Sequence, residues 1–226
     1  MGELIDMESA RALVSDQVLW PRVRDFLWDF APQVHSSWLD RLVVGSSDRQ
    51  ILEMPNPRVK SWVLKELGVE PCFHAFPQDD WSRLLLLDGA TLESIAGWLG
   101  ALACADSLRR VTDGKVVRGL KASLPGIYPE VFGYTAYFKG FKGEDLGLKI
   151  EEGSLGEIGC LGGHILLSIL DSLPAPLVMR LKLKLPKAYS DGLPPDANLQ
   201  ASSSSQKSLT RLLKLKFPEA YSLCCS

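Results

Sequence analysis

Residues 91–103 read Thr-Leu-Glu-Ser-Ile-Ala-Gly-Trp-Leu-Gly-Ala-Leu-Ala, and they are the most strongly patterned stretch of the sequence. The apolar side chains recur at spacings of three and four residues, which is the spacing of one face of an α-helix. Thr91 has a hydroxyl that can cap the first turn, and Arg109 and Arg110 follow where cations favour a helix C-terminus. We therefore expect a central helix from Thr91 toward these arginines that buries the stripe of Leu92, Ile95, Ala96, Leu99, Leu102 and Ala103.

Similar stripes on both sides of this stretch predict further helices. Three of them end at residues that stop helices, which are Gly45, Gly68 and Pro125. A mainly α fold follows, with a single compact multi-helix domain of eight or nine helices and little sheet. The stripes are Leu19, Val23, Phe26, Leu27 and Phe30; Trp38, Leu39, Leu42 and Val43; Val59, Trp62, Val63 and Leu67; and Val116, Val117, Leu120 and Leu124.

Glycines recur at every third residue from Gly153 to Gly162, and Gly163 follows directly. Ser154 and Glu157 have the spacing of a capping box in front of an apolar run. Each glycine inside a helix is about 0.8–1 kcal/mol less favourable than alanine. The segment is therefore either a helix held by tertiary packing or a loop at its start. Close backbone packing is the favoured role for the glycines, because the run lacks the spacing of a phosphate-binding loop.

The composition is that of a globular protein, with 46% hydrophobic and 23% charged residues. The net charge of −2 lacks the basic excess of a dedicated nucleic-acid binder, so we expect no nucleic-acid partner. The longest uncharged Leu-rich run, at residues 94–105, is shorter than the roughly 20 residues of a membrane-spanning helix. The odd number of cysteines, five, suits a reducing compartment. We expect a cytoplasmic protein.

The C-terminal part differs in charge from the rest and contains a repeat. Residues 177–226 hold 8 basic and 3 acidic side chains, whereas residues 1–176 are acidic overall. Residues 181–190, Leu-Lys-Leu-Lys-Leu-Pro-Lys-Ala-Tyr-Ser, return at residues 213–222 as Leu-Lys-Leu-Lys-Phe-Pro-Glu-Ala-Tyr-Ser. The alternation would also suit short strands, but leucines spaced by four favour two short helices. We expect residues 1–176 to form the helical body and residues 177–226 a short basic C-terminal helical extension.

The apolar residues of this extension are expected to lie in a core. A stripe of six apolar residues left in water invites association, so we expect them to be buried and the lysines to face outward. Residues 191–208 between the two copies are rich in serine and proline, which is typical of a mobile linker. The expected buried residues are Leu177, Leu181, Leu185, Leu209, Leu213 and Phe217.

No arrangement of residues predicts a catalytic, cofactor or metal site. His35, His74 and His164 lack partners at metal-ligand spacing, and neither a serine nucleophile elbow nor a phosphate loop occurs. The remaining candidates are basic residues that could bind an acidic protein partner. There are alternatives to partner binding: these residues could form a solvated face or contact a membrane surface. Arg109 and Arg110 could instead stabilise the C-terminus of their own helix. The candidates are Arg109, Arg110, Arg180, Lys182, Lys184, Arg211, Lys214 and Lys216.

Residues 84–133 carry a resemblance to a known family. Leu-Leu-Leu-Leu at 84–87 precedes Leu-Glu-Ser-Ile-Ala-Gly-Trp-Leu-Gly-Ala-Leu-Ala-Cys-Ala-Asp-Ser-Leu-Arg-Arg-Val at 92–111 and Asp-Gly-Lys-Val-Val-Arg-Gly-Leu at 113–120. This series resembles the SctK/YscK family of cytoplasmic proteins of bacterial type III secretion systems. Leu-Pro-Ala-Pro-Leu at 173–177 and Leu-Leu-Lys-Leu-Lys-Phe-Pro-Glu-Ala at 212–220 are similar to the late region of that family.

The resemblance implies a non-enzymatic adaptor of the injectisome sorting platform, at the cytoplasmic face of the bacterial inner membrane. Members of the family connect the cytoplasmic domain of the inner-membrane ring protein, the D component, to the pod protein, the Q component. They thereby support the ATPase complex and substrate loading. The resemblance implies no reaction and no cofactor. Two alternatives stay open: another helical protein-binding module, such as a secretion chaperone or regulator, and an enzyme whose site the sequence does not reveal.

Overall fold

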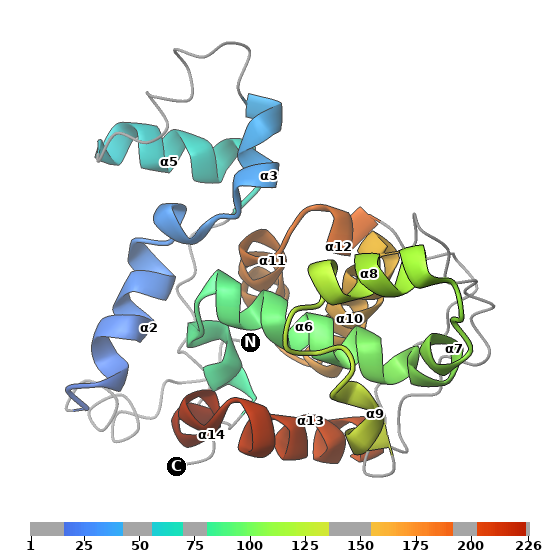
Figure 1. Ribbon diagram of the computed structural model, residues 1–226. Helices are drawn as coiled ribbons and strands as arrows, with labels where there is room; N and C mark the ends of the chain where they lie inside the picture. Colours follow the sequence, from blue (N-terminus) through green and yellow to red (C-terminus); the bar gives the residue numbers. More distant parts are fainter. Residues whose placement is uncertain (1–15, 43–55, 70–80, 136–154, 192–202, 225–226) are drawn as a thin grey trace.

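The computed structural model describes residues 16–42, 56–69, 81–135, 155–191 and 203–224, which are helical and contain no strand (Figure 1). The prediction of a mainly α fold is confirmed. These ranges hold 12 α-helices rather than eight or nine, because four-residue helices are too short to show a period in the sequence. The elements are α2 (Leu19–Trp28), η1 (Ala31–Gln33), α3 (Ser36–Leu39), η2 (Asp40–Leu42), α5 (Pro57–Glu66), η3 (Ser82–Leu86), α6 (Gly89–Ala103), α7 (Ala105–Arg109), α8 (Gly114–Ser123), α9 (Val131–Tyr134), α10 (Leu155–Ile169), α11 (Ala175–Lys184), α12 (Ala188–Asp191), α13 (Ser203–Lys216) and α14 (Pro218–Cys224), where η marks 3₁₀-helices.

Two long helices, α6 and α10, pack side by side at the centre of the fold. Every residue of α6 from Ile95 to Ala103 is buried, so protein surrounds this part of the helix on all sides. The apolar stripe expected of the central helix is buried throughout, including Leu99 and Leu102. That prediction is confirmed.

Glycines let α6 and α10 meet backbone to backbone. A Cβ built on Gly100 of α6 would lie 1.9 Å from the carbonyl oxygen of Ile158. A Cβ built on Gly162 of α10 would lie 1.7 Å from the carbonyl oxygen of Ala96. Because a Cβ atom essentially never comes within 3.0 Å of a non-bonded atom, no side chain fits at either position. The closeness of the two helices therefore depends on these two glycines.

The same glycine run also receives α12. The phenol oxygen of Tyr189 lies 2.6 Å from where a Cβ of Gly159 would stand, and the Tyr189 ring also covers Gly163. The predicted role of the glycines in close packing is confirmed at these positions, and the segment is a helix. Gly153 and the predicted cap Ser154 lie outside the described residues.

The start and end of α6 differ from the prediction. Asp88, rather than Thr91, caps the helix, because its carboxylate accepts both the amide and the hydroxyl of Thr91 at 2.8 Å. The helix therefore begins earlier than predicted, at Gly89. It also ends at Ala103, and a turn at Cys104 separates it from α7, which carries Arg109.

Helix α2 packs against η3, which leads into the start of α6 (Figure 1). All five apolar residues predicted for the α2 stripe are buried, which confirms that stripe. Trp38 of α3 is buried, and its Nε1 donates to the carbonyl oxygen of Leu185 at 2.9 Å, which joins α3 to the end of α11. Val43 and Gly45, where the second stripe was predicted to end, lie outside the described residues.

Helix α5 follows its predicted stripe only in part. Val63 and Leu67 are buried, and the helix ends before Gly68, whose φ of +70° suits glycine. Trp62, however, is 45% exposed. The prediction was wrong at this residue because α5 packs mainly on η1, and this contact covers the side of α5 that carries Val63 and not the side that carries Trp62.

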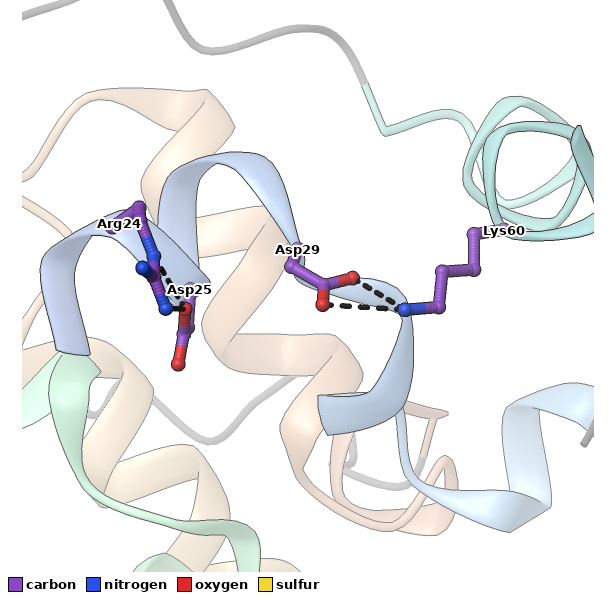
Figure 2. A network of polar contacts seen from close by, with 4 residues as sticks. All are labelled: Arg24, Asp25, Asp29 and Lys60. Carbon is purple, nitrogen blue, oxygen red and sulfur yellow. Dashed lines mark hydrogen bonds and ion pairs between the residues drawn. The ribbon is translucent and has the colours of Figure 1, made fainter. Parts of the chain in front are cut away.

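Two ion pairs involve the region of α2, and one of them joins it to α5 (Figure 2). Lys60 of α5 reaches Asp29 at the end of α2, with 2.8 Å between Nζ and Oδ1, and Arg24 pairs with Asp25 within α2 at 2.8 Å. At least one partner of each pair is well exposed, so each contributes about 0–1 kcal/mol. The attachment of α5 therefore depends mainly on its buried apolar residues.

The two copies of the C-terminal repeat have the same local structure. Each forms the last turn of a longer helix, then a proline, and then a short helix, which gives α11–Pro186–α12 and α13–Pro218–α14. The helical prediction is confirmed over the strand alternative. The division of the chain between residues 176 and 177 stays a prediction. The expected apolar residues are buried, fully for Leu177, Leu181, Leu185, Leu209 and Leu213 and partly for Phe217.

The predicted linker is shorter than expected within the described residues. Residues 188–191 form α12, and residues 203–208 form the first turns of α13. The prediction was wrong at 203–208 because serine is well suited to the start of a helix, and Leu209 and Leu212 anchor that helix in the core. Residues 192–202 lie outside the described residues.

Alanine substitutions on α10 test the backbone contact. Gly162→Ala should lower the free energy of unfolding by more than about 3 kcal/mol, because the new Cβ meets backbone that cannot turn aside. Gly156→Ala on the same helix is the matched control, since nothing lies within 4 Å of its Cβ, and it should leave stability unchanged or slightly higher. Urea unfolding measures both values. Equal effects of the two substitutions would contradict the contact.

Candidate protein-interaction surface

The predicted basic candidates fall into different environments. Arg180 and Lys184 are each only 2% exposed. Lys182 and Lys216 are half-buried, whereas Arg109, Arg110, Arg211 and Lys214 are exposed. The expectation that the lysines of the C-terminal segment face outward is therefore wrong for Lys184, and Arg180, a predicted partner-binding residue, is buried as well.

Arg180 and Lys184 stand one turn apart on α11 and both point into the protein. Nη1 of Arg180 donates to the carbonyl oxygen of Phe26 at 2.8 Å, and its guanidinium lies 5.2 Å from the centre of the Phe30 ring. Nζ of Lys184 donates to the carbonyl oxygens of Leu85 and Leu87, at 2.6 and 2.8 Å. These carbonyls belong to the irregular junction of η3 and α6, and buried carbonyls need donors. Both cations therefore donate hydrogen bonds to backbone carbonyl oxygens inside the protein.

Burial also changes the titration of Lys184. It lowers the pKa of this amine from 10.5 to about 7, and the nearby carboxylate of Asp88 opposes the shift only in part. The amine lies 5.0 Å from the centre of the Phe26 ring, which lines the same apolar site. Lys184 is thus a structural donor of the core.

Two further candidates hold neighbouring elements together. Nη2 of Arg109 donates to Thr135 at 2.7 Å and to the carbonyl oxygen of Phe132 at 3.2 Å, which ties α7 to the region of α9. Lys216 at the end of α13 pairs with Glu130 and lies 4.8 Å from the centre of the Trp98 ring. Although burial alone would lower it, hydrogen bonds to Glu130 and Tyr134 raise the pKa of Lys216.

The exposed candidates on α13 form one continuous surface. Helix α13 lies below α6 in the view of Figure 1. On its inner side Leu209, Leu212 and Leu213 are buried. Its outer side is exposed and carries no acidic residue, and it is called the α13 basic face: Lys207, Arg211, Lys214 and Leu215. Leu215 is 49% exposed, so this face combines positive charge with an apolar contact.

A cavity of about 640 Å³ lies between α2, the junction of η3 and α6, and α14, and the end of α13 at Lys216 also lines it. Its walls include Arg22 of α2, Arg83 of η3 and Leu223 of α14. Sequence reasoning missed this site because its walls come from three distant parts of the chain, and no local pattern joins them.

The two described histidines have different surroundings. Nε2 of His35 lies 3.2 Å from Glu93, and burial followed by the charge of Lys182 lowers the pKa of His164. Among the described residues no group of three or more His, Cys, Asp or Glu side chains could hold a metal ion. Within the same ranges no helix combines the length and the apolar character needed to cross a membrane. His74 lies outside them.

The chain matches no protein-family model, no curated protein and no solved structure. Of the predicted partner-binding residues, Arg211 and Lys214 share one exposed face, and Arg110 lies apart at the end of α7.

Lys184 should make stability depend on pH. Its pKa is about 7 in the folded protein and near 10.5 in the unfolded chain, so the unfolded chain binds more protons between these values. The free energy of unfolding should therefore rise with pH above about pH 7, by up to about 1.4 kcal/mol per pH unit, and the gain is lost as pH falls through 7. Lys184→Met removes the titrating group and should flatten the profile.

Urea unfolding of both proteins at about pH 7 and about pH 8.5 measures this difference. Burial raises the pKa of Cys104 to about 11 and that of Tyr189 to about 12. Both groups therefore lower the free energy of unfolding as pH rises, which opposes the effect of Lys184. They are present in both proteins, so they do not affect the comparison. The same rise between the two pH values in both proteins would contradict the role given to Lys184.

Proposed function

We propose that this protein is a non-enzymatic adaptor of the type III secretion sorting platform. It would link the cytoplasmic domain of the inner-membrane ring protein to the pod protein and so support assembly of the ATPase complex and protein secretion. The observation that carries the proposal is the resemblance of residues 84–133 to the SctK/YscK family. This stretch contains α6, the central helix of the fold, together with α7, α8 and most of η3 and α9.

The packing of the chain suits an adaptor, which has to keep two partners at a fixed separation. Helix α6 is buried on all sides from Ile95 to Ala103 and is in backbone contact with α10, which gives a body with little freedom to deform. Such a body transmits the position of one bound partner to the other.

The α13 basic face is the surface through which we expect one platform partner to bind. Lys207, Arg211 and Lys214 present positive charge on successive turns, and the exposed Leu215 supplies apolar area among them. An acidic partner surface complements this charge and is steered toward it, which speeds association. Arg180 and Lys184 do not belong to this surface, because they are buried.

Binding of the purified chain to purified platform proteins tests the proposal. The ring-protein cytoplasmic domain and the pod protein come from the same genome as this chain. We expect a complex with each. The triple variant Lys207→Glu/Arg211→Glu/Lys214→Glu should weaken one of the two at least tenfold, and about 1.4 kcal/mol of lost interaction is enough for that.

A matched control reverses three exposed cations on α8, in the variant Lys115→Glu/Arg118→Glu/Lys121→Glu. It changes the net charge by the same amount and should bind as the unmodified chain does. Absence of any complex with either platform protein would contradict the proposed function. Equal weakening by the two triple variants would mean that total charge, rather than the α13 basic face, governs binding.

A further inference from the structure

We propose that the cavity between α2, η3 and α14 binds a carboxylate side chain of a partner protein through Arg22 and Arg83. This inference goes beyond the proposed function and does not rest on it, because any protein segment with an accessible aspartate or glutamate could enter the site. The cavity volume of about 640 Å³ is large enough for such a side chain together with a neighbouring residue.

Arg83 has donor groups that the described residues leave unused. Its Nε is buried and has no hydrogen-bond acceptor among them. Its Nη1 reaches only the carbonyl oxygen of Leu223, at a long 3.4 Å. A buried N–H without an acceptor is unfavourable, and a carboxylate is the acceptor that matches the fork of a guanidinium. Arg83 therefore forms the inner end of the site.

Arg22 stands on the α2 wall of the same cavity and is exposed. Its side chain makes no hydrogen bond or ion pair with the residues that the structure describes. An exposed arginine near an inner one is suited to attract an anion and then to hold its second oxygen.

The other charges in the cavity wall are largely occupied by the protein itself. Oδ1 of Asp16 accepts the amides of Val18 and Leu19 at 2.9 and 2.8 Å, and these bonds, together with the charge of Arg83, lower the pKa of Asp16. Asp88 caps α6, and Lys216 pairs with Glu130. Oδ1 of Asp16 and both carboxylate oxygens of Asp88 thus already have donors. Among the described residues, Arg22 makes no hydrogen bond and Arg83 makes only the long one to Leu223.

The character of the wall favours a carboxylate over a phosphate. Asp16, Asp88 and Glu219 all line the cavity, and their negative charge repels a doubly charged phosphate more than a singly charged carboxylate. Val18 also lines it and is 68% exposed, and Leu223 adds a second apolar group. The expected ligand is therefore an acidic residue flanked by apolar ones.

Titration of the full chain with short peptides tests the inference. The probe is the blocked tripeptide acetyl-Leu-Glu-Leu-amide, and acetyl-Leu-Gln-Leu-amide is its neutral counterpart. The Nε–Hε signals of the arginines in a ¹H–¹⁵N spectrum report binding. We expect the Arg83 signal to move on addition of the glutamate peptide and the glutamine peptide to bind at least tenfold more weakly.

Arg83→Gln and Arg22→Gln should each weaken binding of the glutamate peptide at least tenfold. Arg118→Gln on α8 is the control and should not change it, and a circular-dichroism melt establishes that each variant is folded. Because Arg22 is exposed, its variant keeps the test valid even where Arg83→Gln does not fold. Equal affinity for the two peptides, or equal weakening by all three variants, would overturn the inference. Tighter binding of inorganic phosphate than of the glutamate peptide would overturn it as well.

Discussion

The backbone contact between α6 and α10 is the constraint on which the rest of the structure depends. Gly100 and Gly162 bring the helices so close that each carbonyl ladder occupies the place where the side chain of the other would stand. Dispersion and apolar burial along this contact favour the closest approach that the chain allows. The neighbouring elements then pack around a fixed pair, as Tyr189 of α12 does on Gly159 and Gly163 of α10.

The basic C-terminal segment packs against the body of the protein through internal partners of two of its lysines. Lys184 and Lys216 occupy equivalent positions in the two copies of the repeat, at the ends of α11 and α13. One amine satisfies carbonyls at the junction of η3 and α6, and the other pairs with Glu130 beside two aromatic rings. The repeated motif therefore supplies internal donors, and the charge left outside is concentrated on the α13 basic face.

The sequence predicts those features that one segment can display alone. Helical periodicity predicted the buried stripe of α6 and the helical form of both repeat copies, and the recurring glycines without phosphate-loop spacing predicted close packing of the glycine run. It did not predict the burial of Arg180 and Lys184, because only the folded chain places the Phe26 carbonyl and the carbonyls at the η3–α6 junction opposite them. The cavity with Arg22 and Arg83 escaped prediction for the same reason. The α13 basic face was predicted in part, since charge on a helix suggests an outer side but cannot identify it.

Native-state hydrogen exchange tests the central claim most directly, which is that α11 and the α6–α10 pair belong to one cooperative core. We predict that the buried amides of α6, α10 and α11 exchange slowest and share one opening free energy, equal to that of global unfolding. Amides on the outer sides of α5 and α13 should exchange faster. An opening free energy for α11 well below that of α6 and α10 would contradict the account, because the C-terminal segment would then detach while the central pair stays closed.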